Sequence, residues 1–242
     1  MRYGIFSDIH SNLEALDRVI NAYKNESIDK YLCVGDIVGY AANPNESIER
    51  VRSLTEISIA GNHDWAAVGL FSTQYFNPVA YEAIAWTSRN LSENNKYFLK
   101  NLKLVYEDKE LTLVHGTLNK PERFDYMFNL FTAGETFRLM QSRICFIGHT
   151  HVAGCFIKHK DGDLDYNTKG YISMEKGNQY IINVGSVGQP RGRIPKATYC
   201  IYDTDKKEAW IKRIDYEIEV ARKKIIDAGL PRFLADRLLS GM

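Results

Sequence analysis

Short apolar runs in this chain repeatedly end in aspartate, asparagine or histidine, and this pattern restricts the fold more than any other feature. It occurs at Asp8-Ile9-His10, Gly35-Asp36, Gly61-Asn62-His63-Asp64, His115-Gly116 and Gly148-His149-Thr150-His151. Short apolar runs bounded by glycine and polar residues predict buried strands. In α/β sheets, ligands bind at the carboxyl ends of the strands, where the connecting loops converge. The sequence therefore predicts one polar site at the edge of an α/β structure.

The first part of the chain predicts strands that alternate with helices. Residues 3–7, 31–34 and 56–60 read as strands, with helices through about Tyr23 and Leu54 between them. A βαβαβ order favours a parallel sheet with right-handed crossovers. Asp8 and His10 are two residues apart, so on an extended segment both side chains should point the same way.

The later part of the chain changes to short strands. Helices are expected from Pro78, over 92–102 and over 132–140, and strands over 111–114 and 144–147. Six short strands follow, at 154–159, 164–168, 171–175, 179–184, 198–203 and 209–215, before a helix over 217–228 and a last turn to Ser240. This order predicts a second, mixed sheet packed on the first. Because no linker separates two parts, we expect a single domain over 1–242.

Charge and composition exclude several classes of protein. The 31 Lys+Arg and 30 Asp+Glu nearly cancel, and the net charge of +1 argues against a general nucleic-acid or membrane-surface binder. No apolar run approaches membrane-spanning length, and Asp8 comes too early for a secretory signal, so a cytoplasmic location is the default expectation. The cysteines have neither a disulfide framework nor CxxC metal spacing, and they predict buried free thiols.

Histidines are concentrated at the predicted strand ends. Five of the six, His10, His63, His115, His149 and His151, follow an apolar run, whereas Lys158-His159-Lys160 predicts a solvated surface. One histidine in such a place is more often structural, but five together with Asp8, Asp36 and Asn62 predict a divalent metal site. These candidate ligands exceed the four to six that one ion accepts, so two ions fit better, with Asp36 placed to bridge them.

Taken in order, the five motifs resemble the full motif set of the calcineurin-like metallophosphoesterase superfamily. Residues 35–40, 183–191 and 228–231 are similar to its small bacterial and archaeal phosphodiesterase branch. The resemblance implies a four-layer αββα sandwich of two mixed β-sheets flanked by helices. It implies one metal site formed by Asp8, His10, Asp36 and His151, and a second formed by Asp36, Asn62, His115 and His149. It also implies that His63 is the catalytic imidazole and that Asp64 holds its orientation.

The function implied by this resemblance is the hydrolysis of small or nucleotide phosphodiesters by a hydroxide that bridges two divalent ions. Mn²⁺ is the expected ion, with Fe, Zn, Ni or Co as alternatives. The second motif continues as Ile37-Val38-Gly39-Tyr40 and lacks the arginine of the GDxxDRG motif in protein phosphatases, so a phosphoprotein phosphatase is less favoured. A phosphomonoesterase and an asymmetric dinucleoside-polyphosphate hydrolase remain alternatives. A non-catalytic scaffold of the same fold is less favoured, because such proteins lose ligand histidines.

Other segments leave alternatives open. The loop that begins at Gly185 predicts substrate contacts from Ser186, Arg191 and Arg193, although solvated loop arginines are about as plausible. The aromatic residues between Trp65 and Asn77 suit either core packing or a lid over the substrate. A homo-oligomer is also left open.

Overall fold

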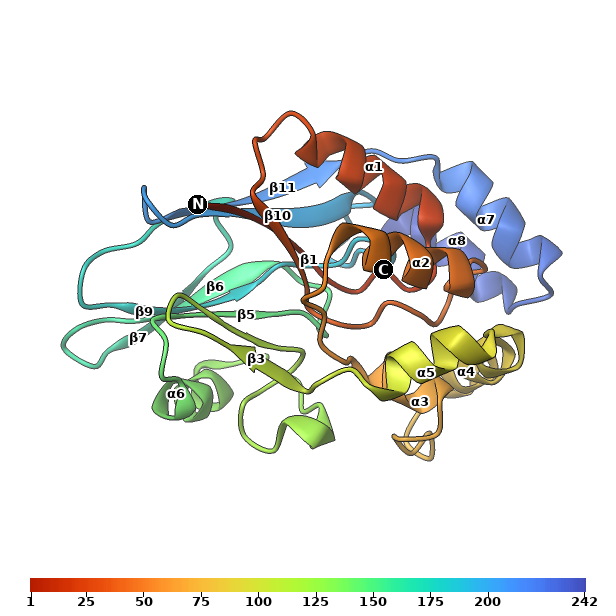
Figure 1. Ribbon diagram of the computed structural model, residues 1–242, viewed down its shortest axis with the longest axis horizontal. Helices are drawn as coiled ribbons and strands as arrows, with labels where there is room; N and C mark the ends of the chain where they lie inside the picture. Colours follow the sequence, from red (N-terminus) through yellow and green to blue (C-terminus); the bar gives the residue numbers. More distant parts are fainter.

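The computed structural model describes residues 1–242, which form two β-sheets packed face to face between layers of helices (Figure 1). The first sheet contains β1 (Arg2–Phe6), β2 (Lys30–Cys33), β8 (Tyr171–Ser173), β10 (Ala197–Asp203) and β11 (Glu208–Ile214), in the order β2-β1-β10-β11-β8. The second contains β3 (Val105–Glu107), β4 (Thr112–Val114), β5 (Ile144–Ile147), β6 (Gly154–Lys158), β7 (Leu164–Asn167) and β9 (Gln179–Asn183), in the order β3-β4-β5-β9-β6-β7.

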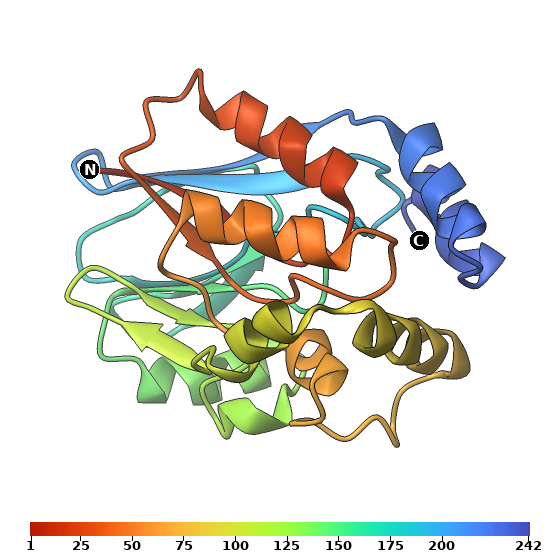
Figure 2. The same cartoon turned by 45° about the vertical axis from the view of Figure 1, so that its right-hand side comes forward.

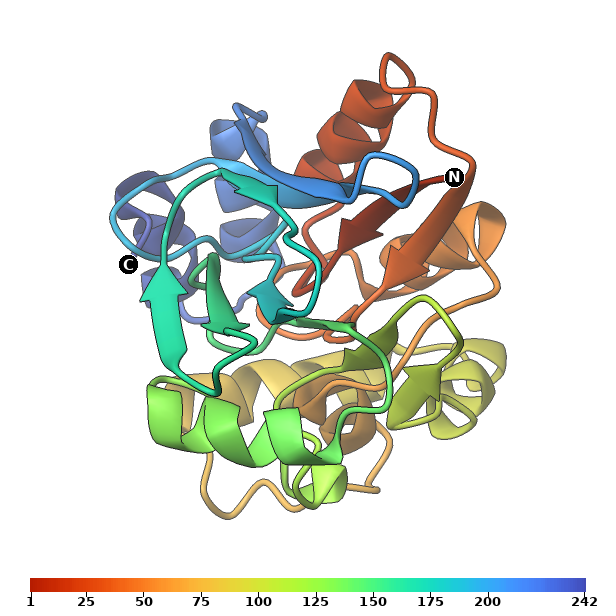
Figure 3. The same ribbon diagram turned by 90° about the vertical axis from the view of Figure 1, so that its left-hand side faces the viewer.

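Helices cover the outer faces of both sheets. They are α1 (Leu13–Tyr23), α2 (Pro44–Leu54), α3 (Asn62–Ala67), α4 (Pro78–Asn90), α5 (Glu93–Lys100), α6 (Leu130–Leu139), α7 (Ile218–Asp227) and α8 (Arg232–Ser240), with a 3₁₀ turn at Pro121–Arg123. Helix α1 packs on β10 and β11 and contacts α7, which pairs with α8 (Figure 2). Helix α6 lies against the second sheet (Figure 3). None of these helices has both the length and the apolar character needed to cross a bilayer.

The central strands are largely apolar because both of their faces are buried, as in β5 and β10, whereas edge strands such as β7 and β8 carry exposed residues. On β10, Cys200 and Tyr202 point into the core between the two sheets, whereas Tyr199 and Ile201 point into the core under the helices. Such a strand has a nearly continuous apolar run in place of an alternating pattern. All four cysteines are free and buried, as expected.

The fold class of two mixed sheets flanked by helices is confirmed, but the division of strands between the sheets differs from the expectation. Strands β10 and β11 join the first sheet, where β10 runs antiparallel to β1, and β4 and β5 join the second, where β5 runs parallel to β9. Each sheet therefore combines strands from early and late in the chain. Sequence order could not show this, because pairing depends on contacts between distant segments.

The predicted strand at 56–60 is not formed as a continuous strand, and the motif that follows it lies on a helix. Only isolated bridges form, from Ser58 to Cys33 and from Ile59 to Lys103, because this segment crosses between the edges of the two sheets. Directly after it, the motif residues Asn62 to Asp64 begin α3 and do not lie in a loop. Strand β3 was not predicted.

Candidate metal centre

The five motifs meet at one end of the sandwich, at the carboxyl ends of parallel strands from both sheets. Asp8 and His10 follow β1, Asp36 follows β2, Asn62 begins α3, His115 follows β4, and His149 and His151 follow β5. Strands β1 and β2 are parallel neighbours, as are β4 and β5, so their loops leave on the same side. All seven side chains are buried. The predicted ligands are therefore brought together.

The loops that carry these residues have left-handed backbone, unlike the extended segment expected for Asp8 and His10. Positive φ angles occur at Asp8 (54°), His10 (51°), Asp36 (52°), His149 (67°) and His151 (62°). The loops are joined by main-chain hydrogen bonds from Asp8 N to Gly35 O and from His10 N to Asp36 O, both 3.0 Å. Non-glycine residues in this conformation are strained, and such strain concentrates at functional sites.

Two motif glycines are required because the chain passes close to the aspartates. A side chain at Gly61 would overlap the carboxylate of Asp36, and one at Gly148 would overlap Ser7 and the carboxylate of Asp8. Glycine therefore lets the backbone approach both carboxylates.

The ligand atoms form two groups that share Asp36. One group comprises Asp8, His10, Asp36 and His151, the other comprises Asp36, His115 and His149, and within each group the ligand atoms lie within 4.8 Å of one another. His151 Nε2 is 3.2 Å from Asp8 Oδ1, and His115 Nε2 is 3.2 Å from Asp36 Oδ2.

Hydrogen bonds to the main chain set the histidine tautomers. The Nδ1 atoms of His10, His115 and His151 lie 3.1, 2.7 and 2.6 Å from the carbonyl oxygens of Val38, Val34 and Gln189. Because a carbonyl oxygen only accepts, each Nδ1 must donate its hydrogen, and in the neutral ring each Nε2 then presents a lone pair to the site. This arrangement is typical of metal-binding histidines.

Several buried polar atoms in the site have no hydrogen-bond partner. These include Asn62 Oδ1 and His149 Nε2. A buried polar atom without a partner is costly, and a cation would satisfy both. Carboxylate, amide and imidazole ligands suit divalent metals such as Mn²⁺, Fe²⁺ and Zn²⁺. The residues present therefore fit a divalent metal centre.

Burial and charge shift the pKa values of the site in opposite directions. Burial lowers the pKa of His149 to about 3 and that of His63 to about 4. Burial also acts to lower the pKa of His115, but the negative charge of Asp36 outweighs it and raises that pKa to about 9. Despite burial, which acts to raise it, the pKa of Asp36 is held well below its usual value by the neighbouring His115 and His63.

His63 lies beside both ligand groups, but Asp64 does not hold its ring. The Asp64 carboxylate accepts the main-chain N–H groups of Ile37 (2.8 Å), Val38 (3.1 Å) and Gly61 (3.0 Å), whereas His63 Nδ1 has no hydrogen-bond partner. The predicted contact between the two side chains is therefore wrong. Asp64 instead fastens the Asp36 loop to the start of α3.

The predicted substrate-binding residues differ in where their side chains lie. Ser186 is fully buried, donates to Asp8 O (2.8 Å) and accepts from Gln189 N (2.9 Å), so it cannot face a substrate and that prediction is wrong. Arg193 is exposed, with its main-chain N–H bonded to Gly241 O. Only Arg191, which is half-buried, lies next to the site, beside Tyr40 and Tyr126.

Sequence reasoning missed three residues around the metal ligands. The ring of Tyr40 packs on His10 and His63, with centroids 4.6 and 4.5 Å apart, and Tyr126 stacks on His149 at 3.9 Å. The third is Arg237 of α8, whose guanidinium group interacts electrostatically with Tyr40 and Arg191. The Gly-Tyr pair after the second motif was a signal for Tyr40, but neither Tyr126 nor Arg237 stands near a motif.

The aromatic residues of the segment 65–77 divide between the two expected roles. Trp65 and Phe71 pack edge-on against Phe124, which is core packing. Phe76 lies 5.1 Å from His63, and Tyr75 is 87% exposed. Core packing therefore accounts for the first pair only.

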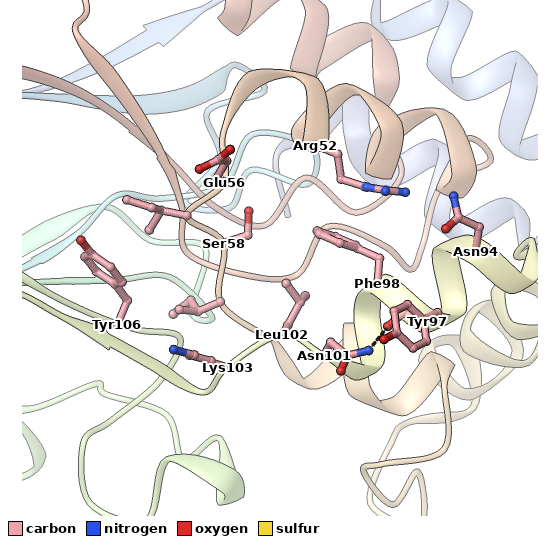
Figure 4. Close-up of a pocket in the computed structure, with 12 residues that line it drawn as sticks. Arg52, Glu56, Ser58, Asn94, Tyr97, Phe98, Asn101, Leu102, Lys103 and Tyr106 are labelled. Carbon is pink, nitrogen blue, oxygen red and sulfur yellow. Dashed lines mark hydrogen bonds between the residues drawn. The ribbon is translucent and has the colours of Figure 1, made fainter.

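A large pocket of the protein lies away from the metal centre. It has a volume of about 430 Å³ and lies between α2, α5 and the residues around Tyr106, and Figure 4 shows Arg52, Phe98 and Lys103 among its lining residues. No metal ligand lines it. A smaller pocket of about 90 Å³ adjoins the centre and is lined by Tyr40, Asn62, His63, Tyr75, Phe76, Asn77, Ala80 and Tyr126. Its size means that a substrate would extend beyond it.

Comparisons with known proteins agree with this geometry. A family model of the calcineurin-like phosphoesterase superfamily domain matches residues 1–207. An uncharacterized protein of Methanocaldococcus jannaschii is 40% identical over 247 residues, which cover 98% of this chain and 97% of the relative. The crystal structure of a metallophosphoesterase from Sphaerobacter thermophilus is similar, with a TM-score of 0.87 and 36% identity over 100% of this chain and 99% of that one. A hypothetical protein from Pyrococcus horikoshii shares the fold, with a TM-score of 0.81 and 18% identity over 100% and 98% of the two chains. The chain therefore belongs to the calcineurin-like phosphoesterase superfamily and is a metal-dependent hydrolase of phosphoric esters.

Proposed function

We propose that this protein is a phosphodiesterase with a dinuclear metal centre that hydrolyses small phosphodiesters, including those of nucleotides. The observation that carries this proposal is that Asp36 belongs to both groups of ligand atoms. A carboxylate has two oxygens and can serve two cations at once. Two mononuclear sites would not require a shared residue.

The two cations would be held by the residues of the two groups. Asp8, His10, Asp36 and His151 hold the first, and Asp36, Asn62, His115 and His149 hold the second, with Mn²⁺ as the proposed ion. When bound, such a pair of cations activates water near neutral pH and neutralises charge on the phosphoryl group. Asp8 also accepts the main-chain N–H of His149 at 3.1 Å, which fixes the two groups relative to each other.

His63 is the proposed catalytic residue at the leaving group. Its ring is buried between Tyr40 and Phe76, and it lines the pocket next to the ligands. Its Nδ1 is buried against Gly39 without a hydrogen-bond partner, so a contact with substrate would use the other ring nitrogen, Nε2. We assign it the transfer of a proton to the departing oxygen, or stabilisation of the charge that develops there.

The position of Tyr40 favours a phosphodiester over a phosphomonoester as the substrate. Tyr40 occupies the part of the second motif where protein phosphatases place a phosphate-gripping arginine, and its aromatic face contacts His10 and His63. A diester carries one negative charge where a monoester carries up to two, so it needs less positive charge around the reacting phosphorus.

The proposal is tested by rate comparison on the Mn²⁺-loaded protein. Hydrolysis of bis(4-nitrophenyl) phosphate should exceed that of 4-nitrophenyl phosphate in kcat/KM. A strong preference for the monoester would instead favour a phosphomonoesterase. Measurement of bound metal by mass spectrometry should give two ions per chain.

A further inference from the structure

Two arginines from distant parts of the chain lie together beside the metal centre. Arg191 follows Gln189, whose carbonyl accepts the Nδ1 hydrogen of His151, so the loop that carries it touches the ligands directly. Arg237 lies in α8, the last helix of the chain. Neither belongs to one of the five motifs.

The end of α8 is docked on the loop that contains Arg191. Arg193 N donates to Gly241 O at 2.8 Å, and Gly241 N donates to Arg237 O at 3.0 Å. A side chain at Gly241 would overlap the main chain of Ile194, so the two segments are in close contact. This contact brings Arg237 next to Arg191, and the charge of Arg191 helps to lower the pKa of Arg237, after burial.

These guanidinium groups are held in place yet lack acidic side chains as partners. Arg237 packs over Phe233 and donates from Nε to Met242 O at 2.6 Å, which leaves its two Nη groups without a protein acceptor. Arg191 Nε is buried and has no acceptor at all. By contrast, Arg232 on the same helix is exposed and pairs with Asp236. Two adjacent, partly buried cations repel each other unless an anion lies between them.

The tyrosines locate this arginine pair relative to the metal ligands. The face of Tyr40 covers His10 and His63, and the face of Tyr126 covers His149. The positive charge of Arg191 acts on the hydroxyls of both tyrosines, and its side chain hydrogen-bonds to that of Tyr126. Arg191 is therefore close to the hydroxyl ends of the two rings, whereas the ligands lie under their faces.

We propose that Arg191 and Arg237 together bind a second phosphate group of the substrate, separate from the phosphoryl group that is hydrolysed. This inference rests on the proposed function, because it names the substrate class for the same site: esters with a phosphate beyond the reacting one. Planar guanidinium groups pair with phosphate through two parallel hydrogen bonds, and their free donors match this chemistry.

Two nucleotides that differ by one phosphate test the proposal through binding. We expect the Mn²⁺-loaded protein to bind thymidine 3′,5′-bisphosphate about tenfold more tightly than thymidine 5′-monophosphate in titration calorimetry, as one charge-assisted contact would give. Arg191→Gln and Arg237→Gln should bring the affinity ratio close to one. The matched control Arg232→Gln, on the same helix, should keep the wild-type ratio.

Several results would overturn this inference. Equal affinity of the wild type for the two nucleotides would do so, as would variants that lose the same factor for both, because the arginines would then hold the reacting phosphate. Hydrolysis of bis(4-nitrophenyl) phosphate is measured separately. Its absence would count against the proposed function, while the binding ratio still decides the role of the arginines.

Discussion

The Nε2 atoms of His10 and His151 face each other across 3.0 Å, although each ring directs its Nδ1 to a main-chain carbonyl. Two lone pairs at this distance repel unless a proton or a metal cation lies between them. Metal removal should therefore destabilise the folded chain. At a hundredfold excess over Kd, one bound ion contributes about 2.7 kcal/mol. For a domain of this size, binding of one ion should therefore raise Tm by roughly 5–10 °C, and its removal should lower Tm by the same amount.

Differential scanning calorimetry with EDTA and then with added Mn²⁺ would measure this effect. A His159→Ala variant should respond like the wild type, since His159 lies in the turn between β6 and β7, away from the ligands. An unchanged Tm after complete metal removal would contradict the expected stabilisation.

Asp36→Ala should remove both metals and abolish turnover, because Asp36 is the residue that the two ligand groups share. The matched variant His149→Ala affects one group only and should leave about one ion per chain. Inductively coupled plasma mass spectrometry on the purified variants distinguishes these outcomes. If Asp36→Ala retained two ions, the bridging role would be refuted.

His63→Ala should retain both metals and lose most of its kcat, by about a hundred- to ten-thousand-fold, the usual contribution of a general acid. The ring contributes to neither ligand group, so metal content should not change. Steady-state kinetics together with metal analysis provide the test. A variant with near-normal kcat would exclude His63 from the chemistry.

Asp64→Ala should lower the free energy of unfolding. The substitution leaves the N–H groups of Ile37, Val38 and Gly61 without their acceptor in a buried place. Leaving a buried donor unsatisfied costs about 1–3 kcal/mol, and more where the acceptor is charged. Urea denaturation of the metal-free protein measures this contribution without metal binding. A decrease in the free energy of unfolding below 1 kcal/mol would argue that Asp64 does not hold the Asp36 loop to α3.

Metal affinity should rise with pH up to about 9. In the metal-free protein the pKa of His115 is raised to about 9, so its ring still carries the extra proton at pH 7. A cation binds only the deprotonated Nε2, so each step toward pH 9 removes competition from the proton. Calorimetry in buffers of different ionisation enthalpy should detect proton release at pH 7 that is smaller in His115→Gln. Equal release by the two proteins would contradict this assignment.

The ligand set could be predicted from sequence because each motif is local. A polar residue directly after a buried strand is placed at the sheet edge whichever strands become neighbours, so Asp8, Asp36 and His115 converge even though the predicted division of strands between the two sheets was wrong. Helix α3 also had a local signal. Asp64 stands three residues after Gly61 and accepts its N–H, which is half of a capping box.

Other features depend on contacts that no local pattern encodes. Ser186 has the spacing of a phosphate-binding loop, yet the loop folds inward and its hydroxyl is used by Asp8 and Gln189. Arg237 reaches the site only because α8 docks on residues 193 and 194. Such positions follow from tertiary packing alone.

The ligands come from both layers of the sandwich, with Asp8 and Asp36 on loops of the first sheet and His115, His149 and His151 on loops of the second. A cation bound between these loops would hold the two sheets together at one end of the molecule. The spacing of the reactive groups therefore depends on how the apolar inner faces of the two sheets pack against each other. Most of the residues in this packing are far from any ligand. A substitution that lets these surfaces slide by a fraction of a side chain would misalign the centre without altering a single ligand.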